Sequence, residues 1–170
     1  MKKNLCIAFL LLVFVASGVY FYITSDIASV NLETLRPLAT STSFVGAMAD
    51  SEYEVVEIAT ASSTIRALVA DNDEKLELGL GGRTTLSHDA GMIFDFGAPG
   101  MYGFWMKDMS IPLDIVWIDE DKKVLGILSN LAPETYPNTF NSPSVIGYAL
   151  EVNAGVAKEL GIATGTILTF

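Results

Sequence analysis

From residue 52 onward, the sequence is a series of short apolar or alternating segments separated by turn-forming residues. The first, EYEVVEI (52–58), alternates charged and apolar residues as a half-buried strand does. Such closely spaced segments favour hairpins and leave little room for helices, so they predict a mainly β fold. We expect a compact β-sandwich or barrel-like domain with two short helices. The expected strands are 52–58, 63–70, 91–96, 102–109, 113–119, 123–131, 145–152 and 166–170.

Two segments carry the start and stop signals of short helices. In DNDEKLELGLGG, Asp71 or Asn72 can cap a helix, acidic residues fill its first turn, and glycines end it. The second helix is expected in GVAKELG (155–161). Between the later strands, residues 132–143 contain three prolines and predict a long loop, a feature that is often functional or mobile.

The N-terminus is a candidate membrane segment. Lys2 and Lys3 precede an uncharged apolar run over residues 5–23, which as a helix would rise by about 28 Å, close to a bilayer core. A cleaved signal peptide and an uncleaved anchor are both compatible with it; the length of the run and the bulky Tyr20-Phe21-Tyr22 favour the anchor. We therefore expect residues 1–23 to contact the membrane as a hydrophobic helix and residues 24–51 to form a linker. The domain at 52–170 would then be extracytoplasmic.

Charge and cysteine content narrow the classes of function. Beyond residue 23 the chain keeps 8 of its 10 basic residues and all 20 acidic ones, a formal charge of −12. Nucleic-acid binding needs a basic surface, so no nucleic-acid partner is expected. The only cysteine, Cys6, lies in the apolar run, so no disulfide is expected in the domain.

No catalytic, phosphate-binding or metal-binding motif is present. The only histidine, His88, lies in the polar segment TTLSHDAG and is interpreted as an exposed loop residue. Most zinc sites need several nitrogen or sulfur ligands, so neither a metal nor another cofactor is expected. The acidic run at 119–121 lacks the ligand spacing of a calcium loop and is interpreted as a solvated turn.

Charged residues inside apolar segments are the strongest indication of a site. In LDIVWID (113–119), strand alternation places Asp114 with Val116 and Ile118, so its carboxylate should face inward and need amide donors or a cation. In YALEVNAG, alternation places Glu151 on the face opposite Leu150 and Val152. If 102–109 is extended, Trp105 and Lys107 share a face.

Three blocks, in this order, carry a family resemblance: GLGGRTTLSHDAGMIFDF, FWMKDMSIPLDIVWID and ALEVNAGVAKELGI. They resemble the domain of unknown function 192 (DUF192) family, also known as UPF0127, of exported or membrane-anchored bacterial and archaeal proteins. The resemblance covers about residues 52–170. It implies a compact, mainly β domain and no assigned activity. The matching positions are Arg83, Trp105 to Lys107, Pro112 to Asp114, and Glu151 to Asn153.

Two hypotheses follow for the charged residues in these blocks. They form either a polar network that fixes strand register or a cleft in which Trp105 and nearby aromatics hold a small polar or carbohydrate ligand. We favour a membrane-tethered, extracytoplasmic binding or accessory module of unknown ligand and name no catalytic residue. The alternative is a cell-envelope hydrolase that uses Asp114 and Glu151 as acid and base on a glycan-like substrate. The candidate residues are Arg83, Trp105, Lys107, Asp114, Glu151 and Asn153.

Overall fold

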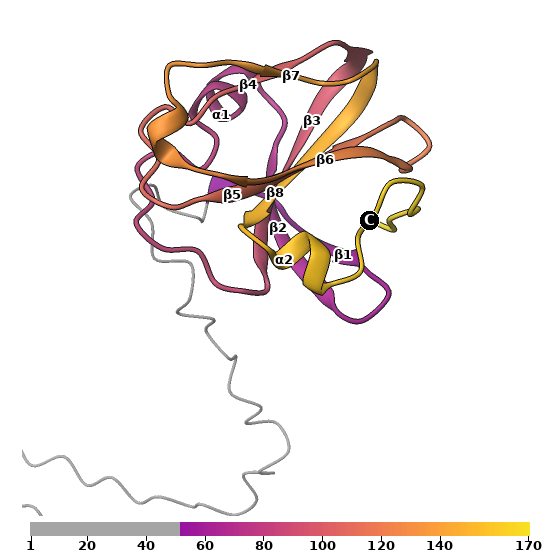
Figure 1. Cartoon of the computed structure of the whole chain (residues 1–170). Helices are drawn as coiled ribbons and strands as arrows, with labels where there is room; N and C mark the ends of the chain where they lie inside the picture. Colours follow the sequence, from indigo (N-terminus) through magenta and orange to yellow (C-terminus); the bar gives the residue numbers. More distant parts are fainter. Residues whose placement is uncertain (1–51) are drawn as a thin grey trace, which may run out of the picture. The chain divides into compact units, whose positions relative to one another are not determined.

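The computed structural model describes residues 52–170, and the predictions for an anchor at 1–23 and a linker at 24–51 lie outside this range. The described part is mainly β with two short helices, as the sequence predicted (Figure 1). Its elements are β1 (Val55–Ala59), β2 (Thr64–Ala70), α1 (Asp73–Leu78), β3 (Ala90–Gly100), β4 (Gly103–Phe104), β5 (Leu113–Ile118), β6 (Val124–Leu131), the 3₁₀ turn η2 (Pro133–Thr135), β7 (Phe140–Asn141), β8 (Ile146–Asn153) and α2 (Val156–Glu159).

Six strands form one mixed sheet, and two short strands form a second one. The order in the large sheet is β1-β2-β3-β8-β5-β6, and the small sheet pairs β4 with β7. Within the large sheet β2 and β3 run parallel, with α1 in the connection between them, and the other neighbours are antiparallel. Figure 1 shows α1, β4 and β7 gathered at the top of the view and α2 at the bottom.

Both faces of the large sheet are buried, and each has its own hydrophobic cluster. Successive residues of a strand point to opposite faces, so the central strands contribute to both clusters. On β5, Ile115 and Trp117 belong to the cluster that includes Phe104, whereas Val116 and Ile118 belong to the cluster that includes residues of α2. The predicted face assignments of LDIVWID are therefore confirmed.

Helix α1 forms where its capping signals predicted. The Asn72 side chain accepts a 3.1 Å hydrogen bond from the Lys75 amide, and the helix ends at Gly79, whose φ of 53° disfavours residues with a side chain. Within residues 52–170, no helix is long and apolar enough to cross a membrane.

Two predicted strands are wrong. The expected strand at 102–109 is reduced to β4, because the chain turns back at Asp108, which has a left-handed φ of 58°. The expected terminal strand at 166–170 makes only isolated bridges, between Ile167 and Lys123 and between Thr169 and Ala59. The predicted loop at 132–143 contains η2 and β7.

Candidate functional site

A cleft of about 250 Å³ lies between α1 and the sheet face that carries the Phe104 cluster. The end of α1 and the residues after it, 76–80, form one wall. The remaining boundary comes from β3, β4 with the preceding Tyr102, the turn at 105–109, and Glu151 of β8. This volume is slightly below the roughly 300–1,000 Å³ of typical ligand sites, so the cleft suits a small molecule. Five aromatic residues line it: Phe94, Phe96, Tyr102, Phe104 and Trp105.

The aromatic walls hold one another in place. The Phe96 and Tyr102 rings stack with centroids 3.7 Å apart, and Phe94 meets Phe104 edge to face at 5.7 Å. The Tyr102 hydroxyl donates a 2.7 Å hydrogen bond to the Ala98 carbonyl. A side chain at Gly100 would come within 3.0 Å of the Tyr102 ring, so glycine at this position leaves room for the ring. Tight ring packing makes these walls a preformed surface.

Glu151 contributes its carboxyl to this cleft from the central strand β8. Its neighbours across the sheet are Met92 of β3 and Ile115 of β5, both in the cluster on the cleft side. The residue is only 5% exposed, and within residues 52–170 its carboxyl has no hydrogen bond and no ion pair. Burial disfavours the charged form and raises the pKa of Glu151 to about 8, so at neutral pH the carboxyl is mostly protonated.

Glycine at position 79 lets α1 end close to this carboxyl. A side chain there would lie 3.3 Å from the Phe94 ring and 3.9 Å from Oε2 of Glu151. The Phe94 ring, the end of α1 at Gly79 and the Glu151 carboxyl therefore lie close together.

Two further charged residues line the cleft, Glu77 of α1 and Lys107. Their closest charged atoms, Lys107 Nζ and Glu77 Oε1, are 3.8 Å apart, and both side chains are largely exposed. Such a loose surface pair contributes little to stability. The cleft thus has two acids and one base, and the base pairs with the exposed acid.

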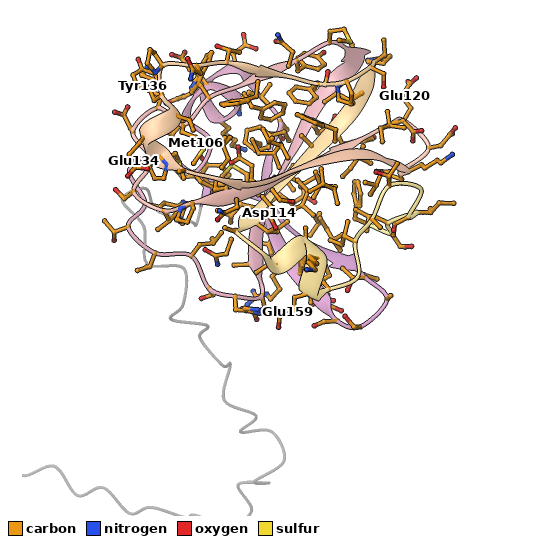
Figure 2. The ribbon with its side chains drawn as sticks, in the orientation of Figure 1. Met106, Asp114, Glu120, Glu134, Tyr136 and Glu159 are labelled. Carbon is orange, nitrogen blue, oxygen red and sulfur yellow. The ribbon has the colours of Figure 1, made fainter. Side chains whose placement is uncertain are left out.

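Asp114 is equally buried, but it lies on the other face of the sheet, between β5 and α2 (Figure 2). Its carboxylate accepts hydrogen bonds from the amides of Asn130 (2.8 Å), Gly155 (2.9 Å) and Ala157 (3.2 Å). The last two amides belong to the start of α2, where the N-cap is Gly155 and has no side chain of its own. Asp114 thus caps this short helix from a neighbouring strand.

This arrangement corrects the hydrolase hypothesis. Asp114 and Val152 are direct partners across β5 and β8, so Asp114 shares the face of Val152, while Glu151 points to the opposite face. Two carboxyls on opposite faces of one sheet cannot act on the same glycosidic bond. The acid–base pair is therefore not available.

The other two candidate residues are near the site but do not line it. The Asn153 amide donates to the carbonyl oxygens of Leu86 (2.9 Å) and Ser87 (3.1 Å), which fastens the loop before β3. Arg83 is buried in the same loop, is 3% exposed, and has an interaction partner. Of the six predicted residues, the structure brings Trp105, Lys107 and Glu151 together in the cleft.

Sequence reasoning missed most of the aromatic wall. Phe94 and Phe96 were assigned to a strand, and their shared face was a usable signal, because residues two apart point the same way. Tyr102 carried no such signal, since its stacking on Phe96 depends on the irregular register of β3 between Asp95 and Gly100.

The described residues offer no metal site and no catalytic triad around His88. No group of three or more His, Cys, Asp or Glu side chains in residues 52–170 could hold a metal ion. The His88 ring lies 2.9 Å from the Glu159 carboxylate, and both side chains are mostly exposed. His88 is thus a surface loop residue, as predicted.

The comparisons with known proteins place this domain in a family. A family model, DUF192, described as an uncharacterised ACR, matches residues 54–170. The chain belongs to the DUF192 family. No curated protein matches the chain.

Two solved structures share the fold of this DUF192 domain. One is a candidate transcription regulator from Sinorhizobium meliloti 1021, and the other is a protein of unknown function from Novosphingobium aromaticivorans DSM 12444. Each is 30% identical to this chain with a TM-score of 0.66. The first match covers 69% of this chain and 94% of the other, and the second covers 74% and 93%. Both neighbours therefore consist almost entirely of this domain.

Proposed function

We propose that the DUF192 domain of this chain is a binding module that holds a small polar ligand, of the size of a sugar ring, in the cleft over Glu151. The observation that carries the proposal is the buried Glu151 carboxyl, which has no partner within residues 52–170 and adjoins an aromatic-lined cleft. The carboxyl is not sealed from solvent but opens onto the cleft, so water or a ligand there has to supply its hydrogen bonds. Aromatic walls with a few polar groups are the usual composition of ligand sites.

Binding is favoured over catalysis because the cleft has one buried acid and no second group placed to share a reaction with it. The exposed Glu77 and Lys107 pair with each other at the surface. The residues that line the cleft include no Ser, Thr, Cys, His or Asp, so they do not supply the nucleophile and base, or the pair of buried acids, that hydrolysis of an acyl or glycosyl bond requires.

A role in DNA binding is not proposed, although one structural neighbour is named as a candidate transcription regulator. Residues 52–170 contain 17 acidic and 7 basic residues. Contact with DNA phosphates depends on Lys and Arg side chains, so this charge opposes it. A binding module that acts on another protein remains compatible with the charge.

We also propose that residues 1–23 anchor the domain on the outer side of the cytoplasmic membrane. The support is the lysine pair followed by an uncharged run of membrane-spanning length. Mass spectrometry of protein extracted from membranes tests it: the expected mass includes residues 1–23. A mature N-terminus near Gly18 would contradict the anchor.

Tryptophan fluorescence tests the binding proposal directly, because both tryptophans, Trp105 and Trp117, lie in this domain and Trp105 lines the cleft. The full-length protein in a non-ionic detergent is titrated with glucose, N-acetylglucosamine, glucosamine and cyclohexylamine. We expect saturable binding of at least one of them and a loss of about tenfold or more in affinity for Trp105→Ala, measured by titration calorimetry because this variant lacks the reporting indole.

The control is Glu159→Gln, an exposed position on α2 beyond the opposite face of the sheet. It should bind each compound like the wild type. If Trp105→Ala also binds like the wild type, the ligand does not occupy this cleft and the proposal is wrong.

A further inference from the structure

The state of Glu151 limits which chemical group can complete the cleft. A buried protonated carboxyl can donate one hydrogen bond, and a buried ionised carboxyl needs a cation or several donors. Glu151 has neither kind of partner within residues 52–170. A ligand that supplies a positive charge recovers more free energy than one that supplies a neutral hydroxyl, because charge-assisted hydrogen bonds are about twice as strong.

The charges around the cleft disfavour an anionic ligand. Besides Tyr102, three titratable residues line the cleft: the acids Glu77 and Glu151 and the base Lys107. The Lys107 amine lies 3.8 Å from the Glu77 carboxylate rather than beside the buried carboxyl. The described part of the chain also has ten more acidic than basic residues. The single positive charge that lines the cleft, Lys107, is thus already beside a carboxylate, so a ligand carboxylate or phosphate would find no unpaired cation there.

The aromatic wall adds an attraction that is specific for cations. Ring faces attract an ammonium group, and the attraction grows as the group is removed from water. Five aromatic residues line the cleft, and the partly exposed indole of Trp105 stands at its surface. The combination of aromatic rings with one buried carboxyl is suited to an organic ammonium group.

We propose that the cleft binds the protonated amino group of a small organic amine, with the Glu151 carboxylate as its counter-ion and the aromatic residues around the attached carbon skeleton. This inference rests on the proposed binding function and names the class of ligand. An amino sugar or a cyclic alkylamine has both parts.

A measurable proton balance follows from this pairing. In the free protein at pH 7 the Glu151 carboxyl mostly holds its proton, because burial raises its pKa to about 8. An arriving R–NH₃⁺ pairs with the carboxylate, so the carboxyl proton leaves to the buffer and nearly one proton is released per ligand bound. The other titratable groups that line the cleft are Glu77 and Lys107, which are exposed, and Tyr102, which is half-buried.

The test uses a matched pair of probes, cyclohexylamine and cyclohexanol, which differ in the charged group alone. Their binding to the full-length protein in non-ionic detergent is measured by titration calorimetry at pH 7. Phosphate and MOPS buffers, which carry no primary amine, differ in ionisation enthalpy and so report the number of protons released. We expect the amine to bind at least about tenfold more tightly than the alcohol and to release nearly one proton. Its affinity should fall by up to about tenfold for each unit of pH below 7.

Two substitutions of the same kind separate the site from the surface. Glu151→Gln keeps the shape but cannot ionise, so it should weaken amine binding by about tenfold or more, abolish proton release and leave cyclohexanol binding nearly unchanged. Glu159→Gln, beyond the opposite face, should change none of these quantities.

Each alternative result contradicts the inference. Amine binding without proton release, or with full affinity in Glu151→Gln, would show that the carboxyl is not the counter-ion. Equal binding of the two probes would leave a cleft for neutral ligands, so the proposed function would stand and the amine assignment would fail. Absence of saturable amine binding up to about 10 mM would overturn the amine assignment.

Discussion

Asp114 and Glu151 are two buried carboxyls on neighbouring strands, but they differ in their hydrogen-bond partners and in what surrounds them. The Asp114 carboxylate accepts three backbone amides and closes the start of α2. The Glu151 carboxyl accepts none within residues 52–170 and lines a cleft. On one face of the sheet the buried carboxylate therefore stabilises the fold, and on the other the buried carboxyl is left available to a ligand.

The difference comes from what covers each face. Over Asp114, β6 is irregular opposite the carboxylate, so the amide of Asn130 turns toward it, and the chain after β8 returns as α2. Over Glu151 the cover consists of aromatic side chains and the end of α1, which bring no hydrogen-bond donor to the carboxyl. Burial alone does not decide whether an acid is structural; the donors around it do.

The largest effect should come from Asp114. Asp114→Leu removes all three acceptor contacts and leaves buried amides unpaired, so we expect a loss of about 3–5 kcal/mol in the free energy of unfolding. Asp114→Asn keeps one oxygen but turns an NH₂ group toward amide donors, and we expect a loss of about 1.5–3 kcal/mol. Urea unfolding of the full-length protein in non-ionic detergent, followed by tryptophan fluorescence, measures both.

Asp119→Asn is the matched control for these variants. Asp119 also accepts two backbone amides, from Asp121 and Lys123, but in a solvated hairpin turn. Its substitution should cost no more than about 1 kcal/mol, because water replaces the lost bonds. If Asp114→Asn and Asp114→Leu both stay within about 0.5 kcal/mol of wild type, Asp114 does not fasten α2 and the contrast between the two faces disappears.

The second effect concerns Glu151 and depends on pH. Its folded-state pKa of about 8 lies above the ordinary value of 4.5, so between these values the folded protein binds more protons than the unfolded chain. Stability should therefore fall as pH rises through this window, by up to about 1.4 kcal/mol per pH unit from this group alone. Below about pH 4.5 the contribution no longer changes with pH.

Glu151→Gln should remove this slope and make the protein more stable than wild type near pH 8. The measurement is urea unfolding at several pH values between 5 and 8.5, with Glu134→Gln, an exposed acid in η2, as the control that keeps the wild-type slope. Identical slopes for wild type and Glu151→Gln would mean that Glu151 has an ionic partner. The cleft would then contain no unpaired acid.

The contrast between these two residues could be predicted from the sequence only in part. Strand alternation showed that Asp114 faces inward and needs amides or a cation. It could not identify the donors, because Asn130, Gly155 and Ala157 are 16, 41 and 43 residues away along the chain. Long-range partners of this kind depend on sheet order and on bulges, which alternation does not encode.

The cleft was harder to predict than the sheet. The segment 102–109 alternates correctly up to Lys107, with Phe104 and Met106 buried and Trp105 partly exposed, so a continuous strand was a reasonable expectation. The chain instead turns at Asp108, and the Met109 amide bonds back to the Met106 carbonyl. This turn places Trp105 and Lys107 beside α1. The cleft therefore forms because the chain does not continue as a strand over residues 102–109.

The smallest effect should come from Lys107, and it tests whether the acid of the cleft is truly unpaired. Lys107 Nζ lies 3.8 Å from the exposed Glu77, and its side chain is 45% exposed. Lys107→Met should therefore change the free energy of unfolding by no more than about 0.5 kcal/mol. It should also strengthen cyclohexylamine binding by about twofold to threefold, because one like charge leaves the cleft. Urea unfolding and titration calorimetry measure the two quantities on the same samples. A loss of more than about 2 kcal/mol would instead mean that Lys107 neutralises a buried carboxylate. Glu151 lines the same cleft, so it would be that carboxylate, and both buried acids would then be structural.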